Sequence, residues 1–189
     1  KRGVQKHLIT EANIVCDWGI EGDAHGGKWH RQISLLSDEK IQEFRAKGAE
    51  VAYGAFGENL IVEGFDFRAL PVGTRFHIGD VVLEMTQIGK ECHHGCEIFQ
   101  KMGECIMPTN GVFAKVLHGG KISVGDEFHV QYRAAVITLS DTASKGERED
   151  ASGAAVEEIV GKEGYEVVFK KIIPDDGDTL TALLCELSD

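Results

Sequence analysis

The sequence contains no run of apolar residues that approaches the ~20 needed to cross a bilayer. It shows no charged-then-apolar leader, and its five cysteines are an odd number, which fits poorly with a framework of disulfides. It also has few basic residues, since 31 acidic residues outnumber 20 basic ones, and the formal net charge of −11 argues against a nucleic-acid-binding surface, which needs clustered Lys and Arg. We therefore expect a cytoplasmic protein with free thiols that binds neither a membrane nor nucleic acid.

The charge is divided unevenly along the 189 residues. Residues 1–130 carry 14 basic and 18 acidic side chains, whereas residues 131–189 carry 6 and 13. The pattern of apolar residues changes at the same place, from short pieces separated by glycine turns to longer alternating segments. The sequence therefore predicts two domains, residues 1–130 and residues 131–189.

Residues 1–130 are dominated by short strand-like segments. Residues 74–78 and 81–85 alternate on either side of a Gly-Asp turn, a pattern typical of a β-hairpin. A helix is expected after Ser37, which can cap it, and Gly48 is expected to end it. Many short strands with glycine turns and one clear helix predict a mainly β domain, a small β-barrel with one or two helices.

Residues 131–189 have the pattern of an alternating α/β module. Residues 134–139 form a continuous apolar run, which is typical of a strand buried on both faces of a parallel sheet. Helical spacing follows in residues 150–162, another strand in residues 165–173, and a second helix that includes Leu180. A parallel sheet needs further strands beyond these two, so we expect an incomplete α/β (βαβα) module.

Three of the cysteines lie in residues 89–113, beside two adjacent histidines. Cys92 precedes His93 at the expected entry to a short helix, where the helix N-terminus and nearby cations would stabilise a thiolate. Cys96, one turn into that helix, and Cys105, beside apolar neighbours, are expected to pack. Burial of Cys92 as a small apolar residue is one alternative. A zinc site of the three cysteines and a histidine is another, although the spacing lacks C-x2-C pairs.

A basic loop, residues 22–32, concentrates positive side chains in an otherwise acidic protein. The backbone N–H groups of such a glycine-rich loop, together with His25, Lys28 and Arg31, could hold an anion. A solvated loop with incidental charge is the alternative. Asn59 is a further candidate for cofactor binding, although its side chain could instead satisfy backbone groups in a turn.

The second domain offers a separate candidate site, where a strand leads into Ser140, Asp141 and Thr142 and then into a helix. Such a junction is a suitable phosphate cradle, because the loop hydroxyls and the helix N-terminus face the carboxyl end of the strand. The acid-rich residues 174–178 could bind a hydrated cation, and capping of the next helix explains at least one of their aspartates equally well.

An ordered set of motifs runs through residues 1–130: Gly19-Ile20-Glu21-Gly22-Asp23-Ala24-His25, Arg31-Gln32, Gly54-x-Phe56-Gly57-Glu58-Asn59-Leu60, Val124-Gly125-Asp126, and Cys92. Together they resemble the MOSC family, which is named for the C-terminal domain of molybdenum-cofactor sulfurases. The resemblance implies a β-barrel with a pocket cysteine that carries sulfur as a persulfide or ligates molybdenum in the bound cofactor. Cys92 matches that cysteine by position, as catalytic residue and metal ligand, whereas Cys96 and Cys105 have no such match.

A second set of motifs lies in residues 133–189: Val136-Ile137-Thr138-Leu139-Ser140-Asp141-Thr142, Ser144-Lys145-Gly146, Asp150-x-Ser152-Gly153 and Ile173-Pro174-Asp175. These resemble the first part of the molybdopterin-binding, adenylyltransferase-type family. The resemblance implies binding of a pterin phosphate and makes Asp175 a candidate for the acidic residue near the metal or nucleotide. The family's Gly-Gly-Thr-Gly phosphate loop and the following Arg-Asp pair are missing, so we expect no adenylyltransferase activity from this segment alone.

Both resemblances lead to a hypothesis of molybdenum-cofactor biosynthesis or sulfuration. Cys92 would accept sulfane sulfur from a pyridoxal-phosphate-dependent cysteine desulfurase and pass it to the metal centre of a molybdoenzyme acceptor, with His93 stabilising the thiolate. The basic loop would hold the phosphate of molybdopterin, and pyridoxal phosphate would act only through the partner desulfurase. Two alternatives stay open: a carrier that holds the cofactor or an oxyanion without turnover, and a mARC-like reductase in which Cys92 is a permanent molybdenum ligand.

Overall fold

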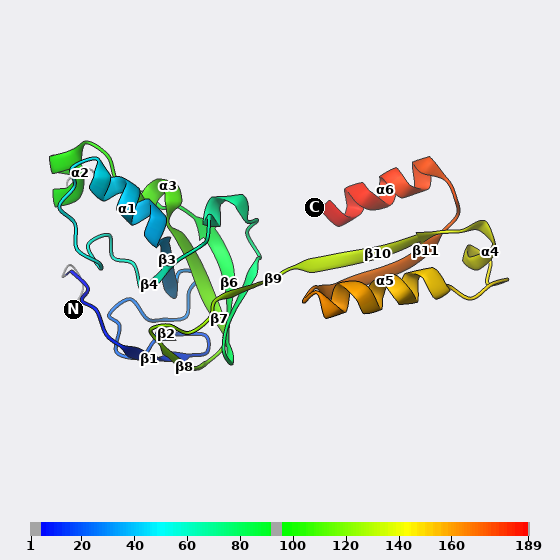
Figure 1. Cartoon of the computed structure of the whole chain (residues 1–189), viewed down its shortest axis with the longest axis horizontal. Helices are drawn as coiled ribbons and strands as arrows, with labels where there is room; N and C mark the ends of the chain where they lie inside the picture. The colour runs from blue at the N-terminus through cyan, green and yellow to red at the C-terminus, as the bar shows by residue number, and fades with distance from the viewer. Residues whose placement is uncertain (1–4, 92–95, 189) are drawn as a thin grey trace. The chain divides into compact units, whose positions relative to one another are not determined.

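The computed structural model describes residues 5–91 and 96–188 of the chain (Figure 1). The chain divides into two compact units, Lys1–Val130 and Gln131–Asp189. Cys92 and His93, the predicted catalytic residue and its neighbour, lie outside the described residues. Within the described ranges, no helix combines the length and the apolar content that a membrane span requires.

The first unit is built from two sheets. The larger sheet contains, in spatial order, β4 (Leu60–Val62), β3 (Ile33–Ser37), β7 (Val112–His118), β6 (Val81–Ile88), β5 (Arg75–Ile78) and β9 (His129–Gln131). The smaller sheet places β1 (Glu11–Val15) between β2 (Gly19–Ile20) and β8 (Gly120–Ser123). Strand β3 pairs with β4 in parallel and with β7 in antiparallel orientation. This arrangement confirms the predicted mainly β fold.

The predicted hairpin is present in the larger sheet. Strands β5 and β6 pair antiparallel with Phe76 opposite Leu83, and Gly79 takes φ +54° in the turn between them. The similar sequence at residues 121–130 forms strands β8 and β9, but these belong to different sheets, and β8 pairs with β1. The local pattern therefore locates these strands, while contacts between distant segments decide their partners.

The interior of the first unit is an apolar cluster drawn from both sheets. Phe76 and Leu83 are 0% exposed within it, and Phe67 meets Phe76 edge to face with ring centroids 5.7 Å apart. Edge-to-face aromatic pairs contribute roughly 0.5–1.5 kcal/mol beyond the burial of their surface. This packing holds the strand ends from which the candidate site is built.

Helix α1 (Asp38–Ala46) covers a second apolar cluster of the first unit. Phe44 on its inner face meets Phe56 edge to face, with ring centroids 5.6 Å apart. The helix begins after Ser37, and Gly48 follows it at φ +94°, so both predicted boundaries are confirmed. The Ser37 hydroxyl makes no capping bond to the helix backbone.

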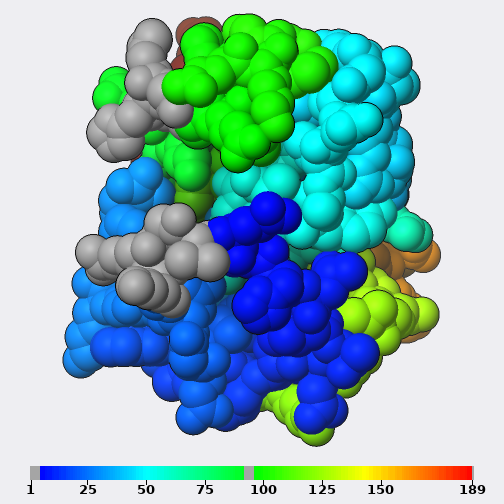
Figure 2. Space-filling view, turned by 90° about the vertical axis from the view of Figure 1, so that its left-hand side faces the viewer, coloured from blue at the N-terminus to red at the C-terminus, as the bar shows by residue number. Residues whose placement is uncertain are grey.

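Two short helices, α2 (Glu97–Met102) and α3 (Met107–Asn110), and the 3-10 turn η1 (Phe67–Ala69) complete the first unit within the described residues. Figure 2 shows the green region that contains α2 and the blue N-terminal segments on one face of this unit. Helix α2 begins at Glu97, so the predicted helix entry at Cys92 is wrong, and Cys96 is the N-cap. Extended backbone at Cys96 (φ −68°, ψ 148°) places its sulfur 3.4 Å from the Phe99 N–H, which donates to it.

Cys96 and Cys105, the two other cysteines of residues 89–113, differ in burial. Cys96 is exposed, because an N-cap lies outside the packed turns of its helix, so the prediction that it packs is wrong. Cys105 is half-buried and packs against the cluster under α1, which confirms the prediction for that residue.

The second unit contains two parallel strands, β10 (Arg133–Leu139) and β11 (Glu166–Ile173), with α4 (Asp141–Ser144), α5 (Ala151–Lys162) and α6 (Gly177–Ser188). Figure 1 shows α5 and α6 on opposite faces of the strand pair. The predicted order of strand, helix, strand and helix is confirmed.

Burial in the second unit departs from the expectation for a central parallel strand. Of residues 134–139, Val136 is buried, whereas Leu139 is 39% exposed. On the helices, Ile159 of α5 is 61% exposed and Leu184 of α6 is 52% exposed. The prediction of a strand buried on both faces is therefore wrong, because β10 and β11 pair only with each other within the described residues.

Candidate functional site

Asp23 organises the basic loop through both of its carboxylate oxygens. Oδ1 accepts the backbone N–H of His25 at 2.7 Å, and Oδ2 accepts from the Asn59 amide at 2.5 Å and from Lys6 Nζ at 3.0 Å. Burial alone would raise the pKa of this carboxyl, but the hydrogen bonds from His25, Lys6 and Asn59 outweigh burial and hold the pKa well below its ordinary value. Asp23 is therefore an ionised anchor whose charge is offset by its own partners.

Asn59 connects this anchor to the larger sheet. Its Oδ1 accepts from the Ser34 backbone N–H at 3.0 Å and from the Ser34 hydroxyl at 2.8 Å, while its amide nitrogen donates to Asp23. The side chain is thus held on both sides by protein groups and fixes the basic loop to β3. Its predicted role as a cofactor ligand stays a prediction.

The Gly54 to Asn59 motif has a structural explanation that sequence reasoning missed. The buried Glu58 carboxylate, 3% exposed, accepts the backbone N–H groups of Gly54 at 2.6 Å and Phe56 at 3.0 Å. Gly54 takes φ +87°, and a Cβ atom there would lie 2.2 Å from the carbonyl oxygen of Lys6. The motif therefore shapes one turn that supports both Lys6 and Asn59, the two side chains that hold Asp23.

Arg31 packs over two aromatic rings. Its guanidinium carbon is 5.0 Å from the centroid of Trp29 and 5.5 Å from the centroid of Phe113. Its Nε is buried and has no hydrogen-bond partner among the described residues. The rings fix the plane of the guanidinium, the group whose forked N–H donors match carboxylate and phosphate oxygens.

His30 fastens the basic loop to the end of β6. Its Nε2 lies 3.0 Å from Gln87 Oε1, and the Gln87 amide donates to the carbonyl oxygen of Gly89 at 2.7 Å. The Gly89 backbone N–H in turn donates to the carbonyl oxygen of Gly111 at 2.7 Å. The basic loop is therefore anchored at Gly89, three residues before Cys92.

The predicted ligands of the first unit are placed as follows. His25 and Lys28 are exposed on the basic loop, Arg31 is half-buried at its end, and Asn59 joins the loop through Asp23. The imidazole Nδ1 of His25 lies 3.2 Å from Asp23 Oδ1. The roles predicted for Cys92 and His93 stay predictions, because both lie outside the described residues.

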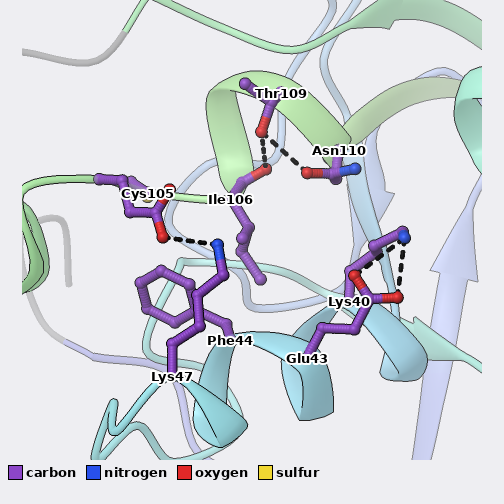
Figure 3. A pocket seen from close by; sticks show the side chains of 9 residues that line it. Lys40, Glu43, Phe44, Lys47, Cys105, Ile106, Thr109 and Asn110 are labelled. Carbon is purple, nitrogen blue, oxygen red and sulfur yellow. Dashed lines mark hydrogen bonds and ion pairs between the residues drawn. The ribbon is translucent and has the colours of Figure 1, made fainter.

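Sequence reasoning also missed a pocket of about 200 Å³ beside α1. Figure 3 shows Lys40 and Lys47 of α1 at its rim, with Phe44, Cys105 and Asn110 also lining it. Lys47 Nζ pairs with Glu104 at 2.7 Å and Lys40 Nζ with Glu43 at 2.9 Å, so the charges of these lysines are already neutralised. The pocket contains none of the residues predicted to bind a cofactor.

In the second unit, the carboxyl ends of β10 and β11 bring the predicted residues together. Asp141 Oδ1 accepts the backbone N–H of Asp175 at 3.2 Å, and the Ser140 N–H donates to the carbonyl oxygen of Ile173 at 2.9 Å. The Ser140 hydroxyl accepts the N–H of Ala143 at 3.2 Å and lies 3.4 Å from the Thr142 hydroxyl. Ser140, Asp141, Thr142 and Asp175 thus form one cluster at the strand ends.

Capping accounts for other acidic residues of this unit. Asp176 Oδ2 accepts the Thr179 backbone N–H at 2.8 Å, and Asp150 Oδ1 accepts the Gly153 N–H at 2.8 Å. Hydrogen bonds from the Thr179 hydroxyl and backbone lower the pKa of Asp176, and that from Gly153 lowers the pKa of Asp150. The alternative expected for the acid-rich segment, helix capping, is confirmed for Asp176.

No group of three or more His, Cys, Asp or Glu side chains among the described residues is arranged to hold a metal ion. The zinc alternative requires Cys92, which is not among them, so it stays a prediction. The described residues do place Lys28 and Arg31 on one loop whose framework is fixed by Asp23, and the predicted anion binding by this loop stays a prediction.

Comparison with known proteins identifies two families along the chain. The model described as MOSC domain matches residues 21–129, and the model described as probable molybdopterin binding domain matches residues 135–189. Molybdopterin adenylyltransferase from Pyrococcus furiosus is 51% identical over 45 residues, which are 24% of this chain and 26% of that protein. The chain thus spans about a quarter of the length of this curated relative.

Solved structures resemble this chain in fold over part of its length. The YUAD protein from Bacillus subtilis has a TM-score of 0.54 at 21% identity, over 65% of this chain and 85% of that chain. A hypothetical protein has a TM-score of 0.50 at 22% identity, over 65% of this chain and 61% of that chain. These likenesses concern the fold alone. The two family matches together support a role related to the molybdenum cofactor.

Proposed function

Because this chain belongs to the MOSC domain family, and because a molybdopterin-binding match follows, we propose that it acts in molybdenum-cofactor biosynthesis or sulfuration with Cys92 as sulfur carrier. The observation that carries this proposal is the anchoring of the basic loop to the end of β6. Through His30 and Gln87 the loop is fixed at Gly89, three residues before Cys92. The basic loop is thereby bonded to the residues that immediately precede Cys92 in the sequence.

The basic loop supplies the binding half of the proposed site. Lys28 and Arg31 would hold the phosphate of the pterin, and His25 would contribute a ring N–H. Asp23 does not oppose such an anion, because its charge is already matched by Lys6 and by the His25 backbone N–H. The cofactor, when bound, supplies the molybdenum centre that receives the sulfur.

Cys92 supplies the chemical half of the proposed site. Its thiolate attacks the terminal sulfur of a persulfide on a pyridoxal-phosphate-dependent cysteine desulfurase. The sulfur–sulfur bond of the donor breaks, the donor cysteine leaves as a thiolate, and Cys92 becomes the persulfide. Release of that sulfur as sulfide needs a second thiol as reductant, which forms a disulfide with Cys92. The acceptor is the molybdenum centre destined for a molybdoenzyme.

The second unit is proposed to bind the same class of ligand. Ser140, Asp141, Thr142 and Asp175 converge at the carboxyl ends of two parallel strands, the edge at which α/β sheets commonly bind phosphates. The match to a probable molybdopterin binding domain over residues 135–189 supports this assignment. Ser140 and Thr142 would face the phosphate, and Asp175 would face a cation bound to it.

Mass spectrometry of the protein after incubation with a cysteine desulfurase and cysteine tests the sulfur-carrier role. We expect one added sulfur atom on Cys92 in the wild type. We expect the same addition in Cys96→Ser, the matched control, because Cys96 is an exposed thiol on the same segment. The addition should be absent from Cys92→Ser. Persulfide formation on Cys96 instead of Cys92 would contradict the proposal, and unimpaired cofactor binding without any persulfide would favour the carrier without turnover.

A further inference from the structure

Both tryptophans of the chain, Trp18 and Trp29, lie at the basic loop. Trp18 is 44% exposed and Trp29 is 41% exposed. Tryptophan is highly buried on average, so two partly open indoles at one loop need an explanation. The contacts of the two indoles with the basic loop explain this exposure, because they hold both rings in place.

The two indoles are fixed against the same three residues, 25–27. The indole N–H of Trp29 donates to the carbonyl oxygen of His25 at 3.1 Å. The carbonyl oxygen of Trp18 accepts the Gly27 N–H at 2.9 Å, and a Cβ atom on Gly26 would lie only 2.5 Å from Trp18 Nε1. Glycine at position 26 therefore allows the Trp18 ring to lie directly on the loop backbone.

Arg31 and His30 both contact the Trp29 ring. The Arg31 guanidinium covers one face of the indole at 5.0 Å from the ring centroid. The His30 imidazole meets Trp29 edge to face, with ring centroids 6.0 Å apart, and the indole is still 41% exposed. The loop presents cations for an anion and, beside them, a fixed aromatic face.

We propose that Trp29, assisted by Trp18, binds the planar fused heteroaromatic ring of a ligand whose phosphate is held by Lys28 and Arg31. The ligand class is a phosphorylated pterin. This inference rests on the proposed function, which places the phosphate on the basic loop, and it adds the residues that select a flat two-ring system over a bare oxyanion. Stacking suits that selection, because aromatic side chains and fused heterocycles stack through their faces.

The probe is 6-hydroxymethylpterin, followed by its fluorescence anisotropy and by quenching of tryptophan emission. Trp29→Ala should weaken binding of this pterin about 5-fold to 150-fold, the range of one aromatic stacking contact. Trp29→Phe, which keeps an aromatic face, should stay within a few-fold of the wild type. Because the chain has two tryptophans, Trp18→Phe leaves Trp29 as the single emitter, and its quenching by the pterin locates the ring.

Inorganic phosphate, titrated separately, distinguishes failure of this inference from failure of the proposed function. Because the Trp29 ring also positions the Arg31 guanidinium, we expect Trp29→Ala to weaken phosphate binding by less than it weakens pterin binding, and Arg31→Ala to lose phosphate binding. Wild-type pterin affinity in Trp29→Ala, or no pterin binding by the wild type, overturns the ring subsite. If phosphate still binds in that case, the anion-binding part of the proposed function stands. If phosphate also fails to bind, the anion-binding part of the proposed function is refuted as well.

Discussion

The substitution Asp23→Asn tests how the candidate site is held together. It preserves the size of the side chain and removes its charge. Asparagine has one acceptor oxygen, so it can accept either from the His25 backbone or from Asn59 and Lys6, and its NH2 group would face a donor at the other position. Hydrogen bonds to charged groups contribute roughly 1.5–3 kcal/mol and neutral ones roughly 1 kcal/mol. The expected loss in free energy of unfolding is therefore about 2 kcal/mol, which lowers Tm by about 4–8 °C.

Urea denaturation followed by tryptophan fluorescence measures this loss in the first unit, because Trp18 and Trp29 both lie there. Asp126→Asn is the matched control. Asp126 also accepts a backbone N–H, that of Ser123 at 2.7 Å, but it lies on an exposed turn, so its substitution should change the free energy of unfolding much less.

The pH dependence of the Asp23 effect has a definite sign. Because the pKa of Asp23 is lowered in the folded state, its stabilisation is complete well above the ordinary value of 3.8 and declines as the pH falls through that value. The difference in stability between the wild type and Asp23→Asn should therefore be smaller at pH 3.5 than at pH 7. An Asp23→Asn protein as stable as the wild type at pH 7, or a difference that grows as the pH falls, would refute the proposed anchor.

Three further substitutions probe the supports of the two sites. Gly54→Ala should destabilise the first unit in urea by more than about 1 kcal/mol, because alanine is strained at φ +87° and its Cβ would meet the Lys6 carbonyl oxygen; unchanged stability would contradict this. Glu58→Gln should lower the free energy of unfolding by about 1.5–3 kcal/mol, since one amide cannot accept both buried N–H donors as a carboxylate does; Glu63→Gln, at an exposed position, is its control. Asp150→Ala removes the cap of α5 and should reduce helicity by circular dichroism, whereas Asp150→Ser should retain most of it.

The features that could be predicted from the sequence are those decided by neighbouring residues. Gly48 ends α1 because a left-handed glycine acts within one turn of a helix, and α1 begins after Ser37 although the Ser37 hydroxyl makes no capping bond. The hairpin of β5 and β6 follows from alternation around one turn. The βαβα order of the second unit has the same local origin.

The features that could not be predicted depend on residues far apart in the chain. The Asp23 anchor joins Lys6 and Asn59, and the stack on Arg31 includes Phe113. No local pattern specifies such partners. At Cys96 the error was a boundary of a few residues, which turned an expected packing residue into an exposed helix cap. The position of the basic loop in the sequence could thus be predicted from its composition. The long-range contacts that hold the loop could not.

The most direct test of the central claim is a crystal structure of the protein with bound molybdenum cofactor, with the metal located by its anomalous scattering. The account predicts the pterin phosphate within hydrogen-bonding distance of Lys28 and Arg31, and the molybdenum within reach of the Cys92 sulfur. Cofactor bound in the pocket beside α1, or with its metal remote from Cys92, would contradict it.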